Sequence, residues 1–312
     1  MVGDQVHQAG PRRTLDLHWY SGDVSPRSKE AKMRYGFVIP TGDPRTVAEL
    51  AHQLEESGWD GAFYWDGIAL DSQWDTVGGH VYDPWVVMAA MAMRTERVRL
   101  GAIVTPPSRR RPWKLARETM TLDHLSGGRL VVPVGLGAVN TFGDVGEVTD
   151  RKVRAAMLDE SLEILTGLWS GEPFSFHGEH YQVGEMAFRP APIQRPRPPI
   201  WVVAAWPRPR SMARALRYDG LLPNFVEPDG NSGEATPERF AEIAAYVAAH
   251  RTAPVPFEII ADGVTPPDDP AAAAAKVRPF AEAGATWWIE SPWEAPNQPE
   301  DVRRRITAGP PR

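Results

Sequence analysis

Glycines at the end of an apolar run are the first feature of this sequence that suggests a ligand site. Residues 129–135 (RLVVPVG) are apolar enough for a buried strand, and the glycine segment 135–137 (GLG) ends the run. Because glycine has no Cβ, a flat ligand can approach the backbone closely there. Pro133 has no N–H and removes one ladder hydrogen bond, so we expect a bulge or local distortion beside the ligand. The alternative is a helix stop at the glycine pair 127–128 followed by an ordinary loop.

Other residues that could take part in catalysis or binding form weaker patterns. The basic run 109–111 (RRR) could clamp an anionic substrate or a cofactor's tail, although such runs are more often solvated. The eight histidines form no HxxxH or HExxH pair, cysteine is absent, and no GxSxG pattern occurs. We therefore expect neither a metal site nor a serine or cysteine nucleophile.

Composition limits the partners that this chain could have. Its 312 residues include 34 basic and 40 acidic side chains, a net charge of −6, which gives no support to nucleic acid or an anionic membrane as a partner. No apolar stretch approaches the roughly 20 residues that a membrane-spanning helix needs. The lack of cysteine suits a reducing compartment. We expect a soluble, cytoplasmic protein that acts on a small-molecule substrate.

The elements that must position these residues alternate along the chain from Met33 onward. Several helices open with Asp-Pro, which supplies an N-cap followed by proline at the first helical position. The apolar runs predict strands at 33–40, 61–66, 98–105, 129–135, 198–206, 219–225, 257–264 and 285–291. The helical spacing predicts helices at 43–59, 83–96, 111–125, 151–169, 208–217, 236–250, 270–283 and 299–307.

Eight strands alternating with helices predict an α/β fold in which a parallel sheet closes into a TIM (β/α)8 barrel. A doubly wound open sheet is the alternative, but no GxGxxG follows the first strand. The stretch at about 170–199 breaks the alternation, because a hairpin-like segment and a proline-rich segment form an insertion between the fourth helix and the fifth strand. Residues 1–32 are polar and broken by Gly and Pro, so we expect a flexible arm before a single barrel domain at 33–312. The alternative is upstream sequence before a start at Met33.

Three segments resemble the luciferase-like family of flavin- and deazaflavin (F420)-dependent monooxygenases and oxidoreductases. They are 109–137 (RRRPWKLARETMTLDHLSGGRLVVPVGLG), 158–181 (LDESLEILTGLWSGEPFSFHGEHY) and 198–220 (PPIWVVAAWPRPRSMARALRYDG). The likeness runs from Met33 to about Phe225 and continues in the order of elements beyond. The resemblance implies a TIM-type barrel with an insertion after the fourth helix, usually dimeric. It also implies a cofactor, reduced FMN or coenzyme F420, that exchanges freely like a substrate.

The resemblance also implies which residues hold the cofactor. The ends of strands two, three and four would line its ring system, and the segment after strand five would bind its phosphate. That segment lacks the family's usual Gly-Gly-x-Ser, but backbone N–H groups and an arginine can still bind a phosphate. Carried over to this chain, the cofactor-binding residues are Trp65, Thr105, Gly135, Leu136, Gly137, Asn140, Ala204, Ala205, Trp206, Arg208 and Arg210.

Two departures from the family concern the acid–base group. Many members carry Asp-His after strand two, whereas this chain has Asp66-Gly67, which should leave more space for substrate. The acid found after strand four in sugar-phosphate members has no counterpart, and Asn140 is the nearest residue. We therefore take Asp66, at the end of a strand, and His80, in the following loop, as the catalytic candidates. A solvated loop histidine and a structural aspartate are the alternatives.

These features predict an oxidoreductase, a monooxygenase that uses reduced FMN and O2 on a small organic substrate while the protein shields the flavin from water. A homodimer and a separate flavin or F420 reductase would accompany it. One alternative is an F420-dependent oxidoreductase, in which hydride is transferred without O2. Another is a flavin-binding barrel without catalytic activity, motivated by the missing histidine.

Overall fold

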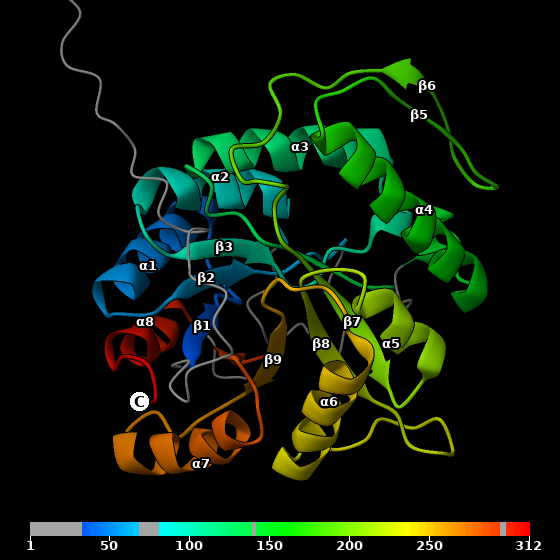
Figure 1. Cartoon of the computed structure of the whole chain (residues 1–312). Helices are drawn as coiled ribbons and strands as arrows, with labels where there is room; N and C mark the ends of the chain where they lie inside the picture. The colour runs from blue at the N-terminus through cyan, green and yellow to red at the C-terminus, as the bar shows by residue number, and fades with distance from the viewer. Residues whose placement is uncertain (1–32, 69–80, 139–141, 294–297) are drawn as a thin grey trace, which may run out of the picture. The chain divides into compact units, whose positions relative to one another are not determined.

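The apolar runs form eight parallel strands that surround a common interior (Figure 1). The computed structural model describes residues 33–68, 81–138, 142–293 and 298–312. The expected arm at 1–32 and two candidate site residues, His80 and Asn140, lie outside the described residues. In chain order the barrel strands are β1 (Arg34–Val38), β2 (Gly61–Tyr64), β3 (Arg99–Ala102), β4 (Val132–Val134), β7 (Ile200–Trp206), β8 (Gly220–Phe225), β9 (Glu258–Gly263) and β10 (Trp287–Glu290).

The helices follow the strands as predicted, and their starts have a local cause. Asp43, Asp83, Asp150 and Asp269 each accept backbone N–H hydrogen bonds as N-caps, and all but Asp150 precede a proline at the first helical position. The helices are α1 (Pro44–Glu56), α2 (Pro84–Arg94), α3 (Pro112–Leu125), α4 (Arg151–Trp169), α5 (Pro209–Ala215), α6 (Pro237–His250), α7 (Pro270–Glu282) and α8 (Pro299–Thr307). Among the described residues, no helix has the length and apolar character to cross a membrane.

The sheet closes on itself between β3 and β4. The strand order is β3-β2-β1-β10-β9-β8-β7-β4, and parallel bridges join Leu100 to Leu130 and Thr105 to Val134. The barrel prediction is therefore confirmed, and the open-sheet alternative is wrong.

The expected distortion near Pro133 lies on the neighbouring strand. Between the two bridges β3 has one residue more than β4, which makes a bulge at 103–104 opposite Pro133. Val131 and Gly135 donate backbone hydrogen bonds to the β3 side, and Pro133 between them has no N–H to donate. The β3 side can therefore leave the ladder opposite Pro133. The Ile103–Val104 peptide bond in the bulge is cis.

Side-chain alternation along the strands builds two apolar layers. One cluster fills the barrel interior and consists of Val38, Phe63, Val131, Trp201, Ile260, Trp287 and Ile289. The larger cluster packs between the strands and the surrounding helices. Trp287 belongs to the inner layer and its neighbour Trp288 to the outer one, as the alternation predicts.

The insertion after α4 lies on the helices and not in the barrel mouth. It begins with an antiparallel hairpin of β5 (Phe174–His177) and β6 (Gln182–Met186), which Figure 1 shows beside α4. The carboxylate of Glu160 on α4 accepts backbone N–H groups from residues 179–181. Asp123 on α3 accepts the backbone N–H groups of Ile193 and Gln194. Glu160 thus fixes the hairpin turn against α4, and Asp123 fixes the proline-rich segment against α3.

Candidate functional site

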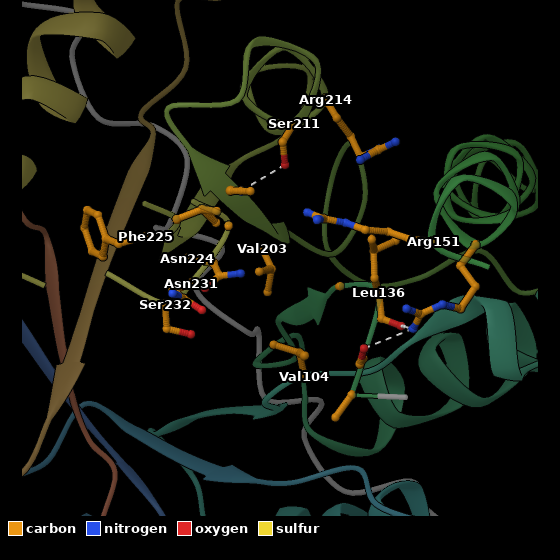
Figure 2. Close-up of a pocket in the computed structure, with 17 residues that line it drawn as sticks. Val104, Leu136, Arg151, Val203, Ser211, Arg214, Asn224, Phe225, Asn231 and Ser232 are labelled. Carbon is orange, nitrogen blue, oxygen red and sulfur yellow. Dashed lines mark hydrogen bonds between the residues drawn. The ribbon is translucent and has the colours of Figure 1, made fainter. Parts of the chain in front are cut away.

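A cavity of about 410 Å³ opens at the carboxyl ends of the strands, the face on which barrel enzymes place their chemistry (Figure 2). Val104, two residues after β3, and residues 135–138 after β4 form one wall. The ends of β7 and β8 and the loop residues 230–232 form another, and the first turns of α4 and α5 close the side. Strand ends, where backbone groups leave the ladder, therefore shape most of this cavity.

Close packing explains the glycines of the segment after β4. Gly135 and Gly137 both line the cavity. A Cβ on Gly135 would lie 3.0 Å from Val203 Cγ2, and one on Gly137 would lie 2.8 Å from Pro106 Cβ. Gly137 also has φ +73°, a conformation that favours glycine. The glycines at these two positions let the segment pack tightly against β3 and β7, and the backbone itself forms the cavity wall.

An arginine that sequence reasoning missed holds this segment in place. Arg154, in the first turn of α4, donates from Nη1 to the carbonyl oxygens of Leu136 (2.6 Å) and Gly137 (3.0 Å). Its guanidinium also lies 5.1 Å from the ring centroid of Phe142. Burial lowers the pKa of Arg154 from its usual value. One signal in the sequence could have found it. Arg154 lies on the apolar side of α4, where a solvated surface arginine is not expected.

Two further arginines and a serine reach the cavity from α4 and α5. Figure 2 shows the side chain of Arg151 extending from α4 into the cavity. Within the described ranges, no carboxylate forms an ion pair with it. Arg214 also lines the cavity, but its guanidinium makes a two-point ion pair with Asp159, at 2.6 and 2.7 Å. Ser211 Oγ accepts the backbone N–H of Ala205 at 2.9 Å. Arg151 is thus the cation best placed to meet an anionic ligand.

The structure brings together only part of the predicted cofactor set. Gly135, Leu136, Gly137 and Ala205 line the cavity, whereas Ala204 faces the helix layer. Thr105 is fully buried, and its hydroxyl has no hydrogen-bond partner among the described residues.

The arginines after β7 stand apart from this cavity. Trp206 and Arg208 line a second cavity of about 470 Å³, together with Arg239 and Glu242, and Val226 lines both cavities. Arg210 is exposed and lines neither cavity. Their role in binding a phosphate stays a prediction.

Asp66 is held in a buried ion-pair cluster. Its side chain is 1% exposed, and both Arg109 and Arg110 pair with it. Arg110 Nη2 lies 2.9 Å from each carboxylate oxygen, and Arg109 Nη2 donates to Oδ1 and to the Asp66 carbonyl oxygen. Burial lowers the pKa of Arg109, against the opposing effect of Asp66. The first two arginines of the basic run are therefore not solvated, and they tie the end of β2 to the 3-10 helix η2 (Pro107–Arg109).

The space expected at Gly67 is occupied by an indole ring. A Cβ on Gly67 would lie 2.3 Å from Trp65 Cζ3. The ring of Trp65 is fixed from its other end, because Nε1 donates to the Pro40 carbonyl oxygen at 3.1 Å. The missing histidine side chain therefore does not enlarge the pocket here, and Trp65 itself fills the position.

No metal-binding group was expected, and within the part of the chain that the structure describes no cluster of three or more His, Asp or Glu side chains could hold a metal ion. His177 is instead hydrogen-bonded through Nδ1 to Gln182 Oε1 at 2.8 Å. The site is therefore organised by arginines, backbone groups and apolar walls.

Comparison with known proteins agrees with this architecture. The family model described as luciferase-like monooxygenase matches residues 23–308. An F420-dependent glucose-6-phosphate dehydrogenase of Nocardia farcinica is 30% identical over 234 residues, which cover 73% of this chain and 64% of that protein. The enzyme of the same name from Nakamurella multipartita is 33% identical over 199 residues, covering 61% and 56%. The chain thus spans between half and two thirds of the length of these relatives.

Solved structures share the fold at low identity. An F420-dependent secondary alcohol dehydrogenase superposes with a TM-score of 0.70 at 19% identity, covering 89% of this chain and 97% of that one. The F420-dependent tetrahydromethanopterin reductase of Methanopyrus kandleri gives 0.69 at 17% identity, with the same coverage. A monooxygenase from Streptomyces bottropensis gives 0.66 at 21% identity, covering 88% and 96%. These similarities establish the barrel architecture.

Proposed function

Since the chain belongs to the luciferase-like monooxygenase family, a family of oxidoreductases, we propose that it is an F420-dependent oxidoreductase acting on a small organic alcohol or carbonyl compound. The observation that carries this proposal is the name shared by the relatives from Nocardia farcinica and Nakamurella multipartita, both F420-dependent glucose-6-phosphate dehydrogenases. The same finding overturns the expected reaction with reduced FMN and O2, and that prediction was wrong. When bound, oxidised F420 accepts a hydride from a substrate carbon.

The cavity at the barrel mouth fits a flat, anionic cofactor. The glycine segment offers a backbone wall on which a ring system can lie, and Val104 and Val203 supply apolar contacts. F420 carries a phosphate and glutamate carboxylates, for which Arg151 is the available cation. Arg154 and Arg214 shape the wall but are already engaged, with carbonyl oxygens and with Asp159. We assign the anion-binding role to Arg151.

Equilibrium binding tests both the cofactor and its anchor. We expect the protein to bind oxidised F420 at least about tenfold more tightly than FMN, as measured by fluorescence quenching or calorimetry. Arg151→Ala should weaken F420 binding at least about tenfold, since a hydrogen bond to a charged group is worth about 1.5–3 kcal/mol. This effect should diminish as salt increases.

The double variant Arg208→Ala/Arg210→Ala is the matched comparison, because both side chains are exposed and lie outside this cavity. If Arg151 holds the anion, this double variant binds F420 nearly as the wild type does. The opposite pattern, weak binding by the double variant and normal binding by Arg151→Ala, would place the anion site after Trp206. Tighter binding of FMN than of F420 would contradict the proposed function.

We further propose that the protein is a homodimer and that a separate F420-reducing or F420-oxidising enzyme recycles the exchanging cofactor. The dimer is proposed to form through the outer face of α2, where Val86 and Met93 are 67% and 70% exposed. These two residues lie seven positions apart, on the same face of the helix.

The oligomeric state tests this interface. We expect the wild type to sediment as a dimer and Val86→Glu/Met93→Glu to sediment as a folded monomer, because two charges would face each other across the contact. Val255→Glu, at a loop position that is 41% exposed, is the control and should remain dimeric. A wild type that is monomeric at high concentration, or a double variant that is still dimeric, would rule out this interface.

A further inference from the structure

A carboxylate at the end of β9 has no role in the site described so far. The family's two usual acid–base positions are unavailable in this chain, because Gly67 has no side chain and Asn140 is an amide. Asp66 is occupied by two arginines, and His80, the other candidate from the sequence, lies outside the described residues. A reaction that moves a hydride to or from a hydroxyl-bearing carbon also moves a proton, so another group must accept or donate it.

Strand register places Asp262 in the mouth of the barrel. Ile260 belongs to the apolar cluster inside the barrel, and side chains two residues apart on a strand share a face. Asp262 therefore faces the interior one layer above Ile260, toward the carboxyl ends of the strands. On one side it pairs in register with Ile289 of β10, whose side chain belongs to the same inner cluster.

The other neighbour of Asp262 belongs to the cavity. The pairing of β8 with β9 joins Leu221 to Ile259, and continuing this register brings Asn224 opposite Asp262. Asn224 lines the 410 Å³ cavity (Figure 2). Asp262 thus stands one strand beyond the cavity wall, on the same open face.

The surroundings of Asp262 differ from those of Asp66. Asp262 is exposed to solvent, and desolvation raises the pKa of its carboxyl. Its register neighbours on β8 and β10 are an amide and an alkyl side chain, so neither brings a charge to it. Across the described ranges no side chain forms an ion pair with it. A solvent-accessible carboxyl with no competing partner is free to exchange a proton.

We propose that Asp262 is the catalytic acid–base residue of this enzyme, an inference that rests on the proposed F420-dependent reaction. Bound F420 in its oxidised form would take up the electron pair of the substrate C–H bond as hydride. The hydroxyl proton passes to the Asp262 carboxylate, and the O–H electron pair forms the carbonyl bond. In the reverse direction the protonated carboxyl returns the proton to the carbonyl oxygen.

Carboxyl NMR of the cofactor-free protein is the first test. With 13C-labelled aspartate, the Asp262 resonance is identified by its loss in Asp262→Asn. We expect this carboxyl to titrate above the ordinary aspartate value of 3.8 and to shift when F420 is added. Asp268, exposed six residues further along, is the matched control, and its carboxyl resonance should not shift when F420 is added. An Asp262 carboxyl that titrates at the ordinary value would overturn the proposal.

Kinetics provide the second test, with glucose 6-phosphate and F420 as the probe. Asp262→Asn should lower kcat at least about 100-fold and abolish the limb of the pH profile that reports the base, while the Kd for F420 changes less than about twofold. Asp268→Asn should behave as the wild type. Normal turnover by Asp262→Asn contradicts the acid–base role of Asp262 and leaves the proposed function intact. Failure of the wild type to bind F420 contradicts the proposed function. In that case the NMR titration of the free protein still tests Asp262.

Discussion

Asp66→Asn is expected to lower the free energy of unfolding by about 3–5 kcal/mol, which is the usual cost of removing one partner from a buried ion pair. The substitution leaves the guanidinium groups of Arg109 and Arg110 buried beside a neutral amide. Both arginines lie more than 40 residues away in sequence, so the loss also disconnects β2 from the segment after β3. Urea unfolding followed by circular dichroism measures the difference.

A surface ion pair provides the comparison for this prediction. Glu118→Gln removes the partner of Lys114, whose side chain is mostly exposed, and should change stability by less than about 1 kcal/mol. If Asp66→Asn is as stable as Glu118→Gln but has lost turnover, the carboxylate acts on the reaction and not on the fold. That result would favour the catalytic role predicted for Asp66 from the sequence.

Arg154→Ala is expected to raise the Kd for F420 at least about 100-fold. The substitution removes two charge-assisted hydrogen bonds to the carbonyl oxygens of Leu136 and Gly137, each worth about 1.5–3 kcal/mol, and leaves those oxygens without their donor. The glycine segment then loses the contact that fixes it as a cavity wall. Fluorescence titration with F420 measures the effect.

The neighbouring Lys152 separates this effect from a general loss of positive charge. Lys152 is exposed on the same first turn of α4, so Lys152→Ala should change the Kd less than about threefold. Arg154→Lys keeps the charge but not the forked geometry and should give an intermediate Kd. Equal binding by Arg154→Ala and the wild type would show that the segment holds its shape without Arg154.

The barrel could be predicted because its signals are local. Asp-Pro pairs mark the helix starts, and continuous apolar runs mark strands that are covered on both faces. Each signal lies within a few residues of the element that it specifies. Even the opposite orientations of Trp287 and Trp288 follow from the twofold periodicity of a strand.

The site could be predicted only where it depends on strand ends. Gly135 and Gly137 line the cavity as expected, but the pairing of Asp66 with the basic run requires contacts between distant segments. The bulge belongs to β3 although the proline that accommodates it is on β4. Asp262 lies in an apolar run whose alternation gives two sets of side chains on opposite faces of the strand. Which set faces the barrel interior follows only from the strand pairing in the closed barrel.

The contact between Trp65 and position 67 constrains the order in which this site can change. A histidine at Gly67, the residue that many family members carry there, would meet the indole ring at its first side-chain carbon. The hydrogen bond of Trp65 to the Pro40 carbonyl oxygen opposes rotation of that ring. The two positions are therefore epistatic. A histidine at position 67 clashes with the indole ring while Trp65 is present, and it is accommodated once Trp65 has been replaced by a smaller residue. An evolutionary or laboratory path to the histidine-bearing site thus passes through position 65 first.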